Sequence, residues 1–174
     1  MRGVKTKVLF LVFFFLLGHC VNLPRSFHAL HYKNQKVYID KNHYYQVGPL
    51  SQAWRKTADK NPGIIFKHAQ WKATLATEAI CGADFEDLPL KMLTNHLLTG
   101  LENFQNTKEE DWLLSGRKAL YTATQASLDG VAVWLNIVVA KKNRCQFDFM
   151  SVAPPEAAQP VTRDFLQFVK GFKY

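Results

Sequence analysis

This sequence lacks the patterns that mark repeat proteins and common classes of enzyme. Its 174 residues contain no fixed-period repeat and no low-complexity tract, and the nine Gly and seven Pro are scattered. Collagen-like, coiled-coil and solenoid architectures are therefore excluded. His-Glu-x-x-His, Gly-x-Ser-x-Gly, phosphate-loop and paired-Cys zinc motifs are also missing from the sequence. The sequence accordingly predicts no catalytic residue, no cofactor and no metal site.

What is present fits one globular domain with an N-terminal extension. Hydrophobic residues make up 48% of the chain and charged residues 21%, which is enough apolar material for a buried core. We expect three parts: a signal peptide over residues 1–19, a basic tether over residues 20–60, and an α+β sandwich domain over residues 61–174.

The N-terminus has the pattern of an export signal. Arg2, Lys5 and Lys7 form a basic head, and Val8 to Leu17 is an unbroken apolar run. Ten apolar residues rise about 15 Å as a helix, roughly half the thickness of the hydrocarbon layer. The run is therefore too short to span a membrane and is typical of a signal peptide.

The residues after this run resemble a bacterial lipobox. Leu17, Gly18 and Cys20 stand at the expected positions, whereas His19 occupies a place where a small residue is usual. Lipidation of Cys20 would hold the protein on the periplasmic or outer side of a bacterial envelope, because two or three acyl chains stay attached to a bilayer. Ordinary cleavage near this point is the alternative.

The predicted tether has an excess of positive charge. The whole chain carries 22 basic and 14 acidic residues, a formal net charge of +8. The basic residues expected to face a membrane are Arg25, Lys33, Lys36, Lys41, Arg55, Lys56 and Lys60. They can rest against anionic headgroups or simply keep the tether solvated. Export and the lack of a nucleic-acid-binding module argue against nucleic acid as a partner.

The domain's hydrophobic pattern predicts strands before and after a helix. Ile64–Phe66 and Ala73–Cys81 have the composition of strands. An amphipathic helix is expected from Leu88 to about Thr99, with Asp87 as its N-cap and Gly100 closing it. We expect residues 108–111 to form an acidic, solvated loop.

Three further strand-like runs follow, at 117–128, 131–141 and 144–152. Asp129-Gly130 is suited to a type I′ hairpin, which places Leu120 opposite Val139. The second hairpin leaves two registers open. A two-residue loop puts Cys145, Phe147 and Phe149 on the face of Trp134, and a three-residue loop puts them on the face of Val139.

A short amphipathic helix is expected to close the domain. After Pro160, the residues Phe165, Phe168, Val169 and Phe172 recur at the spacing of one helical face. We expect this stripe to dock on the sheet.

The order of motifs resembles a group of small uncharacterised bacterial envelope proteins. The motifs are Cys81-Gly82, a Leu-rich helix, Leu114-Ser115-Gly116-Arg117, Leu128-Asp129-Gly130, Phe147-Asp148-Phe149, Ala153-Pro154-Pro155 and a Phe-rich terminal helix. The layout also resembles the PsbP-like α-β-α sandwich, an antiparallel sheet with helices on its faces. This resemblance implies an accessory or assembly role in binding, with a protein partner in the envelope.

The chain has only three cysteines, and their number fits an exported protein. If Cys20 is lipidated, Cys81 and Cys145 remain, and an oxidising compartment favours a disulfide between them. Two buried thiols, or one catalytic thiol, are the alternatives.

Other candidate residues have ordinary structural explanations. His28 and His31 supply only half of a zinc shell and are expected to be solvated. The tryptophans are expected in the core, with a ligand-binding wall between sheet and helix as the alternative. They are Trp54, Trp71, Trp112 and Trp134.

Three functions therefore remain open. The first is a non-catalytic, membrane-tethered envelope protein that binds a protein partner. The second is a carrier of a small apolar ligand or lipid. The third is an enzyme that uses the thiol of Cys81 or Cys145.

Overall fold

The computed structural model describes residues 30–58 and 63–174. The predicted signal peptide, Cys20, Arg25, His28 and Lys60 lie outside these residues.

Two helices and ten strands form an α+β sandwich. The strands are β1 (His31–Lys33), β2 (Lys36–Tyr38), β3 (Tyr44–Gln46), β4 (Trp54–Lys56), β5 (Ile64–His68), β6 (Thr74–Cys81), β7 (Glu102–Leu114), β8 (Arg117–Leu128), β9 (Val131–Lys142) and β10 (Cys145–Ala153). The helices are α1 (Leu90–Leu97) and α2 (Ala158–Lys170), with short 3₁₀ turns at Gly82–Asp84 and Pro155–Ala157.

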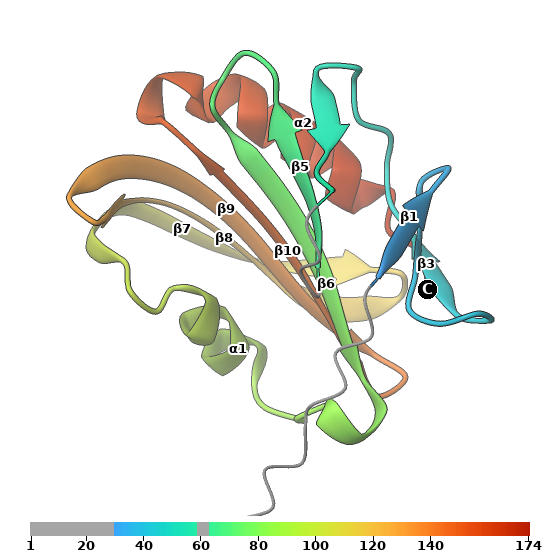
Figure 1. Ribbon diagram of the computed structural model, residues 1–174. Coiled ribbons are helices and arrows are strands. Elements are labelled where there is room, and N and C mark those ends of the chain that lie inside the picture. Colours follow the sequence, from blue (N-terminus) through green and yellow to red (C-terminus); the bar gives the residue numbers. More distant parts are fainter. Residues whose placement is uncertain (1–29, 59–62) are drawn as a thin grey trace, which may run out of the picture.

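Seven strands form an antiparallel sheet in the order β4-β5-β6-β10-β9-β8-β7, and β1-β2-β3 form a separate small sheet. Helix α1 packs against β8 and β9 on one face of the large sheet, and α2 packs against β9 and β10 on the other (Figure 1). The predicted α+β architecture, with helices on both faces of an antiparallel sheet, is confirmed.

Both central hairpins have two-residue loops. Asp129 and Gly130 have φ angles of 50° and 80°, and the register places Leu120 opposite Val139 as predicted. In the second hairpin Lys142 pairs with Cys145 around a two-residue loop, Asn143 and Arg144, in which both residues have positive φ. Type I′ turns need positive φ at both central positions. The open register is therefore resolved in favour of the Trp134 face.

Alternation along β10 directs large side chains into the core beneath α2. Phe147 and Phe149 from the strand, and Phe165 and Phe168 from the helix, are fully buried and belong to one cluster. Burying each phenylalanine stabilises the fold by about 1.5 to 3 kcal/mol. The predicted apolar stripe of the last helix thus docks on the sheet.

Helix α1 is shorter than predicted and has a different cap. Its N-cap is Pro89, without a side-chain hydrogen bond. Asp87 does not cap the helix but accepts a hydrogen bond from the Lys141 ammonium at 2.6 Å. The Asp87 carboxylate thus binds Lys141 of β9 and not the N-terminus of α1. Leu93 of α1 packs on Ile137 of the sheet.

Residues 108–111, predicted as an acidic loop, lie inside strand β7. These residues pair with β8, where Glu109 is opposite Thr122. Because β7 is at the edge of the sheet and mostly exposed, it accepts charged side chains that a central strand would exclude. Composition therefore gave the wrong prediction for this segment.

Residues 30–58, predicted as part of a tether, belong to the folded domain. Strand β4 is an edge strand of the large sheet. In β3, Tyr45 is fully buried, and its hydroxyl hydrogen-bonds with that of Thr77 at 2.8 Å. The indole of Trp54 donates to Asp164 of α2 at 2.9 Å. The boundary at residue 61 is thus too late, because strands of three residues give too few alternating positions to be detected.

A close backbone contact joins the small sheet to α2. The amide of Gly48 donates to the carbonyl of Phe168 at 2.7 Å. A Cβ on Gly48 would overlap the Gln167 carbonyl, and one on Gly171 would overlap the backbone of Gly48. Only glycine allows the two segments to approach this closely.

Candidate binding groove beside helix α2

A groove of about 660 Å³ lies between α2 and the strands β7 and β8. It exists because α2 packs over β9 and β10, which leaves the same face of β7 and β8 partly uncovered. The lining side chains that matter most for binding are Lys108, Glu110, Trp112, Tyr121, Leu166 and Lys170.

The floor of the groove is a pair of stacked aromatic rings. Trp112 and Tyr121 lie with ring centroids 4.5 Å apart and an interplanar angle of 25°. The register explains the contact, since Trp112 pairs with Ala119 and Glu110 with Tyr121, so the two rings are diagonal neighbours on one face. Trp112 is half-buried and Tyr121 is buried, so the indole is the more accessible ring. A stacked pair of this kind offers a rigid, apolar surface to a ligand.

A buried polar network fixes the position of this floor. The Tyr121 hydroxyl donates to Asn136 Oδ1 at 2.9 Å, and Asn136 Nδ2 donates to the hydroxyls of Ser151 and Thr162, both at 3.0 Å. The indole of Trp134 donates to the same Thr162 hydroxyl at 3.1 Å. Thr162 is on α2, so the network joins the helix to the sheet at the side of the groove.

The charges around the floor are partly paired. Lys108 forms an ion pair with Glu110 at 2.6 Å, and the Trp112 indole donates to the same carboxylate at 3.1 Å. These two hydrogen bonds, that from Lys108 first, lower the pKa of Glu110. Burial raises the pKa of the Tyr121 phenol, and the negative charge of Glu110 adds to the rise. Tyr121 therefore stays a hydrogen-bond donor.

The groove runs along an edge strand. Among the described residues β7 pairs only with β8, and its register is regular from Lys108 to Leu114. The side chains of residues 108, 110, 112 and 114 face the groove. An edge strand beside an apolar groove is the arrangement in which proteins bind extended peptides.

A second, smaller cleft of about 360 Å³ lies between α1 and the same two strands. Phe104 contributes an exposed aromatic ring, and an ion pair between Lys91 and Glu109 crosses the cleft. This cleft is little more than half the volume of the groove and has no stacked aromatic pair, so it is the weaker candidate.

Two acidic side chains are paired across β6 and β10, on the α1 face. Asp148 is opposite Glu78 in the register and is only 7% exposed. Its Oδ2 accepts a hydrogen bond from Gln146 at 2.7 Å, whereas Oδ1 has no hydrogen-bond partner in the described part of the chain. Burial raises the pKa of Asp148 to about 7, and the nearby Glu78 adds to the rise.

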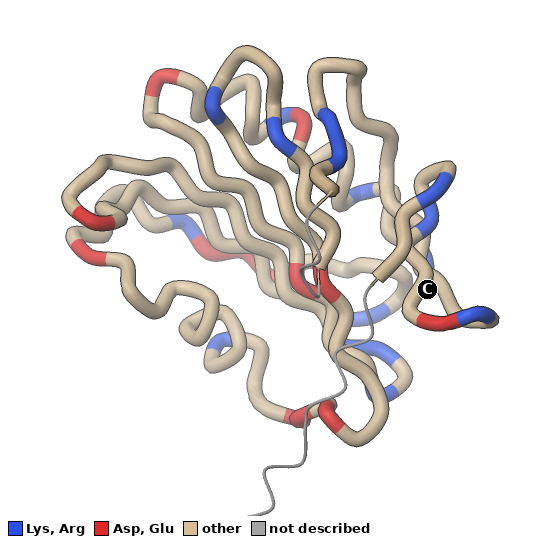
Figure 2. The backbone as a smooth tube through the Cα atoms, in the orientation of Figure 1, with Lys and Arg blue, Asp and Glu red and all other residues tan. Residues whose placement is uncertain are grey.

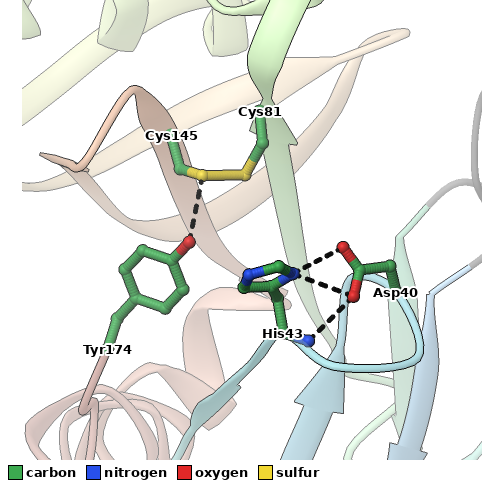
Figure 3. The surroundings of a disulfide bond; sticks show 5 residues. All are labelled: Asp40, His43, Cys81, Cys145 and Tyr174. Atoms are coloured by element: carbon green, nitrogen blue, oxygen red, sulfur yellow. Dashed lines mark hydrogen bonds and ion pairs between the residues drawn. A yellow bond between two sulfur atoms is a disulfide. The ribbon is translucent and has the colours of Figure 1, made fainter.

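The predicted disulfide is present between β6 and β10. Cys81 and Cys145 face each other in the register and are joined, with their Cα atoms 4.1 Å apart (Figure 3). The Tyr174 hydroxyl lies 3.4 Å from Cys145 Sγ. Because the two sulfur atoms are bonded to each other, neither residue supplies the free thiol that the enzyme hypothesis requires.

The basic residues assigned to the tether occupy two separate places. Lys33, Lys36 and Lys41 lie on or beside the strands of the small sheet, whereas Arg55 and Lys56 lie on β4 at the edge of the large one. They do not form one continuous surface (Figure 2).

The four tryptophans also separate. Trp54 is in the core, Trp134 is half-buried beside α2, and Trp71 is half-buried next to His68. Only Trp112 lines the groove. The sequence did not identify Tyr121 or Leu166 as its companions. The alternation of side chains at residues 108 to 114 could have indicated a strand, but the charged residues among them favoured a loop.

Residues 30–58 and 63–174 contain no cluster of three side chains that is suited to holding a metal ion. Within the same ranges, no helix has the length and apolar character needed to cross a membrane.

Comparison with known proteins identifies the fold. No protein-family model and no curated protein matches the chain. Among solved structures, a cyanobacterial PsbP (CyanoP) from Synechocystis sp. PCC 6803 is 13% identical, with a TM-score of 0.53, and the match covers 90% of this chain and 97% of that one. The domain has a PsbP-like fold.

A second solved structure is similar to this PsbP-like domain to a lesser degree. It is LpqN, which is involved in cell envelope biogenesis of Mycobacterium tuberculosis. It is 16% identical with a TM-score of 0.49, and the match covers 74% of this chain and 83% of LpqN. The similarity to the cyanobacterial PsbP confirms the predicted PsbP-like architecture, and at these identities the similarity concerns the fold alone.

Proposed function

We propose that the protein is an exported, lipid-anchored binding protein of a bacterial envelope, which takes up an extended segment of a partner protein in the groove between α2 and β7. The observation that carries this proposal is the stacked pair of Trp112 and Tyr121, whose half-buried indole lines the groove beside an edge strand. The role is binding and not catalysis, since the groove offers aromatic, aliphatic and ion-paired side chains.

Two features support export. The basic head and the apolar run of residues 8–17 have the pattern of a signal peptide, and Cys20 follows at a position typical of lipidation. The disulfide between Cys81 and Cys145 is of a kind that persists in oxidising compartments outside the cytoplasm.

Strand addition is the binding mode that the groove favours. A partner segment that pairs with the outer edge of β7 along residues 108–114 gains backbone hydrogen bonds there. Its alternate side chains then point toward α2 and reach Trp112 and Leu166. An apolar or aromatic side chain at one of these positions supplies the anchor.

Selection of short peptides on the full-length protein tests this proposal. Twelve-residue random peptides are displayed on phage, and a selected peptide is measured by fluorescence anisotropy. Trp112→Ala is expected to weaken its binding by about 10- to 30-fold, because an aromatic anchor often carries most of the binding energy. Trp71→Ala, which removes a half-buried indole outside the groove, is the matched control. Equal binding to Trp112→Ala and to the unmodified protein would refute the groove as the site.

Carriage of a small apolar ligand is a second candidate. The observation that favours it is the volume of the groove, about 660 Å³, which is within the size range of small-molecule sites. Mass spectrometry of the native protein after mild purification tests this function. A lipid that co-purifies with the unmodified protein and is lost from Trp112→Ala would favour carriage over peptide binding.

A further inference from the structure

Basic side chains from four separate segments of the chain gather at one end of the molecule. We call this surface the basic end; it comprises Lys33, Lys36, Lys41, Arg117, Lys118, Arg144 and Lys173. Only the first three of these residues belong to the membrane-facing set predicted from the sequence. Figure 2 shows basic residues on the small sheet and on the neighbouring hairpins, with others on β4 and β5.

Strand pairing and hydrogen bonds bring these segments together. Lys36 pairs with Gln46 in the small sheet, and Gln46 in turn forms a bridge with Lys173. The next residue, Tyr174, contacts both Ser115 in the β7–β8 turn and Cys145 at the start of β10. Arg144 directly precedes Cys145, and Arg117 follows Ser115 two residues later.

The side chains at the basic end are available to a partner. Lys33, Lys41, Arg117, Lys118, Arg144 and Lys173 are exposed, and none of them forms an ion pair with another described residue. Asp40, Asp84, Glu86 and Asp87 also lie at this end; Asp40 is held by His43 at 2.7 Å and Asp87 by Lys141 at 2.6 Å. The balance of formal charge at this end stays positive.

The opposite end of the sheet carries charges of both signs. Strand β8 runs from Arg117 to Leu128, a rise of about 36 Å for an extended strand. Asp129 lies in the turn at its far end, and Glu102 pairs with Ser127 close to that turn. Lys67 pairs with Thr74, and Arg55 pairs with Lys67, so basic residues of β4 and β5 lie at that end as well. The far end is therefore mixed in charge, and the basic end holds the larger set of basic residues.

Apolar side chains are interspersed with the basic ones. Leu113 is 75% exposed and is opposite Lys118 in the register. Tyr44 is also exposed, and the Lys36 ammonium lies 4.2 Å from the centre of its ring. A surface that combines lysine and arginine with exposed leucine and tyrosine is suited to the headgroup region of a bilayer.

We propose that the basic end docks on the anionic headgroups of the membrane that holds Cys20. The described chain begins at Leu30, directly before β1, so it enters the domain beside Lys33. Ten residue-to-residue steps lead from Cys20 to Leu30, which is at most about 33 to 36 Å when fully extended. An anchor at Cys20 therefore keeps the basic end within reach of the surface. This inference rests on the anchored part of the proposed function and is independent of what the groove binds.

Energy transfer measured on the full-length lipidated protein in vesicles tests the docking. A fluorophore is attached through His31→Cys at the basic end, or through Val131→Cys at the opposite end, and a rhodamine-headgroup lipid is the acceptor. Vesicles are pure phosphatidylcholine or a seven-to-three mixture of phosphatidylcholine and phosphatidylglycerol. Transfer from position 31 is expected to exceed that from position 131 in the mixed vesicles, and this difference is lost without phosphatidylglycerol.

Two charge-reversed variants provide the matched comparison. Lys33→Glu, Arg117→Glu and Arg144→Glu together are expected to weaken docking by about a hundredfold, or about five-fold for each residue, and to abolish the difference between the two positions. Arg55→Glu, Lys56→Glu and Lys67→Glu change the net charge equally on β4 and β5, and are expected to preserve the difference.

Each other result overturns the inference in a recognisable way. Equal energy transfer from the two positions in vesicle-bound protein refutes docking on the membrane. The basic end would then be a surface for binding an acidic protein. No transfer from either position, with protein that fails to float with vesicles, refutes the anchor together with the docking. Neither result affects peptide binding to Trp112, which is measured separately.

Discussion

Asp148 is a buried acid whose environment favours its neutral form. It lies on the α1 face of β10, opposite Glu78, and burial raises its pKa to about 7 from a usual value of 3.8. Above about pH 4 the unfolded chain has released this proton, whereas the folded protein retains it until the pH approaches 7. The contribution of Asp148 to the free energy of unfolding is therefore complete below pH 4 and is lost as the pH rises through about 7.

Replacing the Asp148 carboxyl by an amide removes this residue's contribution to the pH dependence of the free energy of unfolding. We expect Asp148→Asn to raise the free energy of unfolding at pH 8 by about 2 to 4 kcal/mol relative to the unmodified protein, since each pKa unit corresponds to about 1.4 kcal/mol. The gain is expected to vanish near pH 4. Urea denaturation at several pH values measures it, with Asp129→Asn in an exposed turn as the control. A gain independent of pH would show that charge is not its cause.

The sequence could not identify Asp148 as buried. In an alternating strand, an aspartate between Phe147 and Phe149 predicts a solvated face, because many antiparallel sheets have one face in water. The same pattern correctly placed the two phenylalanines together in the core. The predicted sandwich has cover on both faces of the sheet, but the sequence did not show that this cover extends over position 148 of β10.

At the level of elements, the register of β8 and β9 was predictable and the identity of β7 was not. Asp129-Gly130 determines both the turn and every pair of the hairpin. Strand β7 has charged residues throughout its middle and irregular pairing between Glu102 and Lys108. The groove was therefore hidden from sequence analysis, because it depends on β7 being a strand.

The contact between α2 and the segment after β3 requires glycine at position 48. We expect Gly48→Ala to lower the free energy of unfolding by about 3 kcal/mol, because its methyl group would overlap backbone atoms that cannot move aside. Gly63→Ala is the graded control, since its Cβ would lie 3.0 Å from the nearest backbone oxygen. Thermal unfolding compares the two. Equal, small effects would mean that α2 shifts freely.

The disulfide joins β6 to β10 across a sequence separation of 64 residues. Removing it through Cys81→Ala and Cys145→Ala is expected to lower the free energy of unfolding by about 3 to 4 kcal/mol, because the unfolded chain regains the entropy of an open loop. Urea denaturation measures the change, and the unmodified protein with dithiothreitol should behave like the double variant. An unchanged urea midpoint would argue that the cross-link contributes nothing.

At the level of the whole molecule, residues 30–58 complete the core of the domain. Tyr45 stacks edge-on against Phe147, with ring centroids 5.2 Å apart, and Tyr32 does the same against Phe66 at 5.0 Å. Without these strands, the α2 face of β5, β6 and β10 would expose aromatic side chains to water. A segment that composition marks as a basic tether is thus required to bury the central phenylalanines.

This dependence predicts where the domain can be shortened. A chain that begins at residue 63 is expected to lose cooperative unfolding and to bind 1-anilinonaphthalene-8-sulfonate, because Phe66, Phe147 and Phe149 lose their cover. A chain that begins at residue 30 retains every described contact of the small sheet and is expected to unfold cooperatively. Calorimetry and dye fluorescence on the two chains compare them directly. Cooperative unfolding of the shorter chain would mean that the core is complete without β1 to β4. The domain boundary predicted at residue 61 would then describe the smallest folding unit.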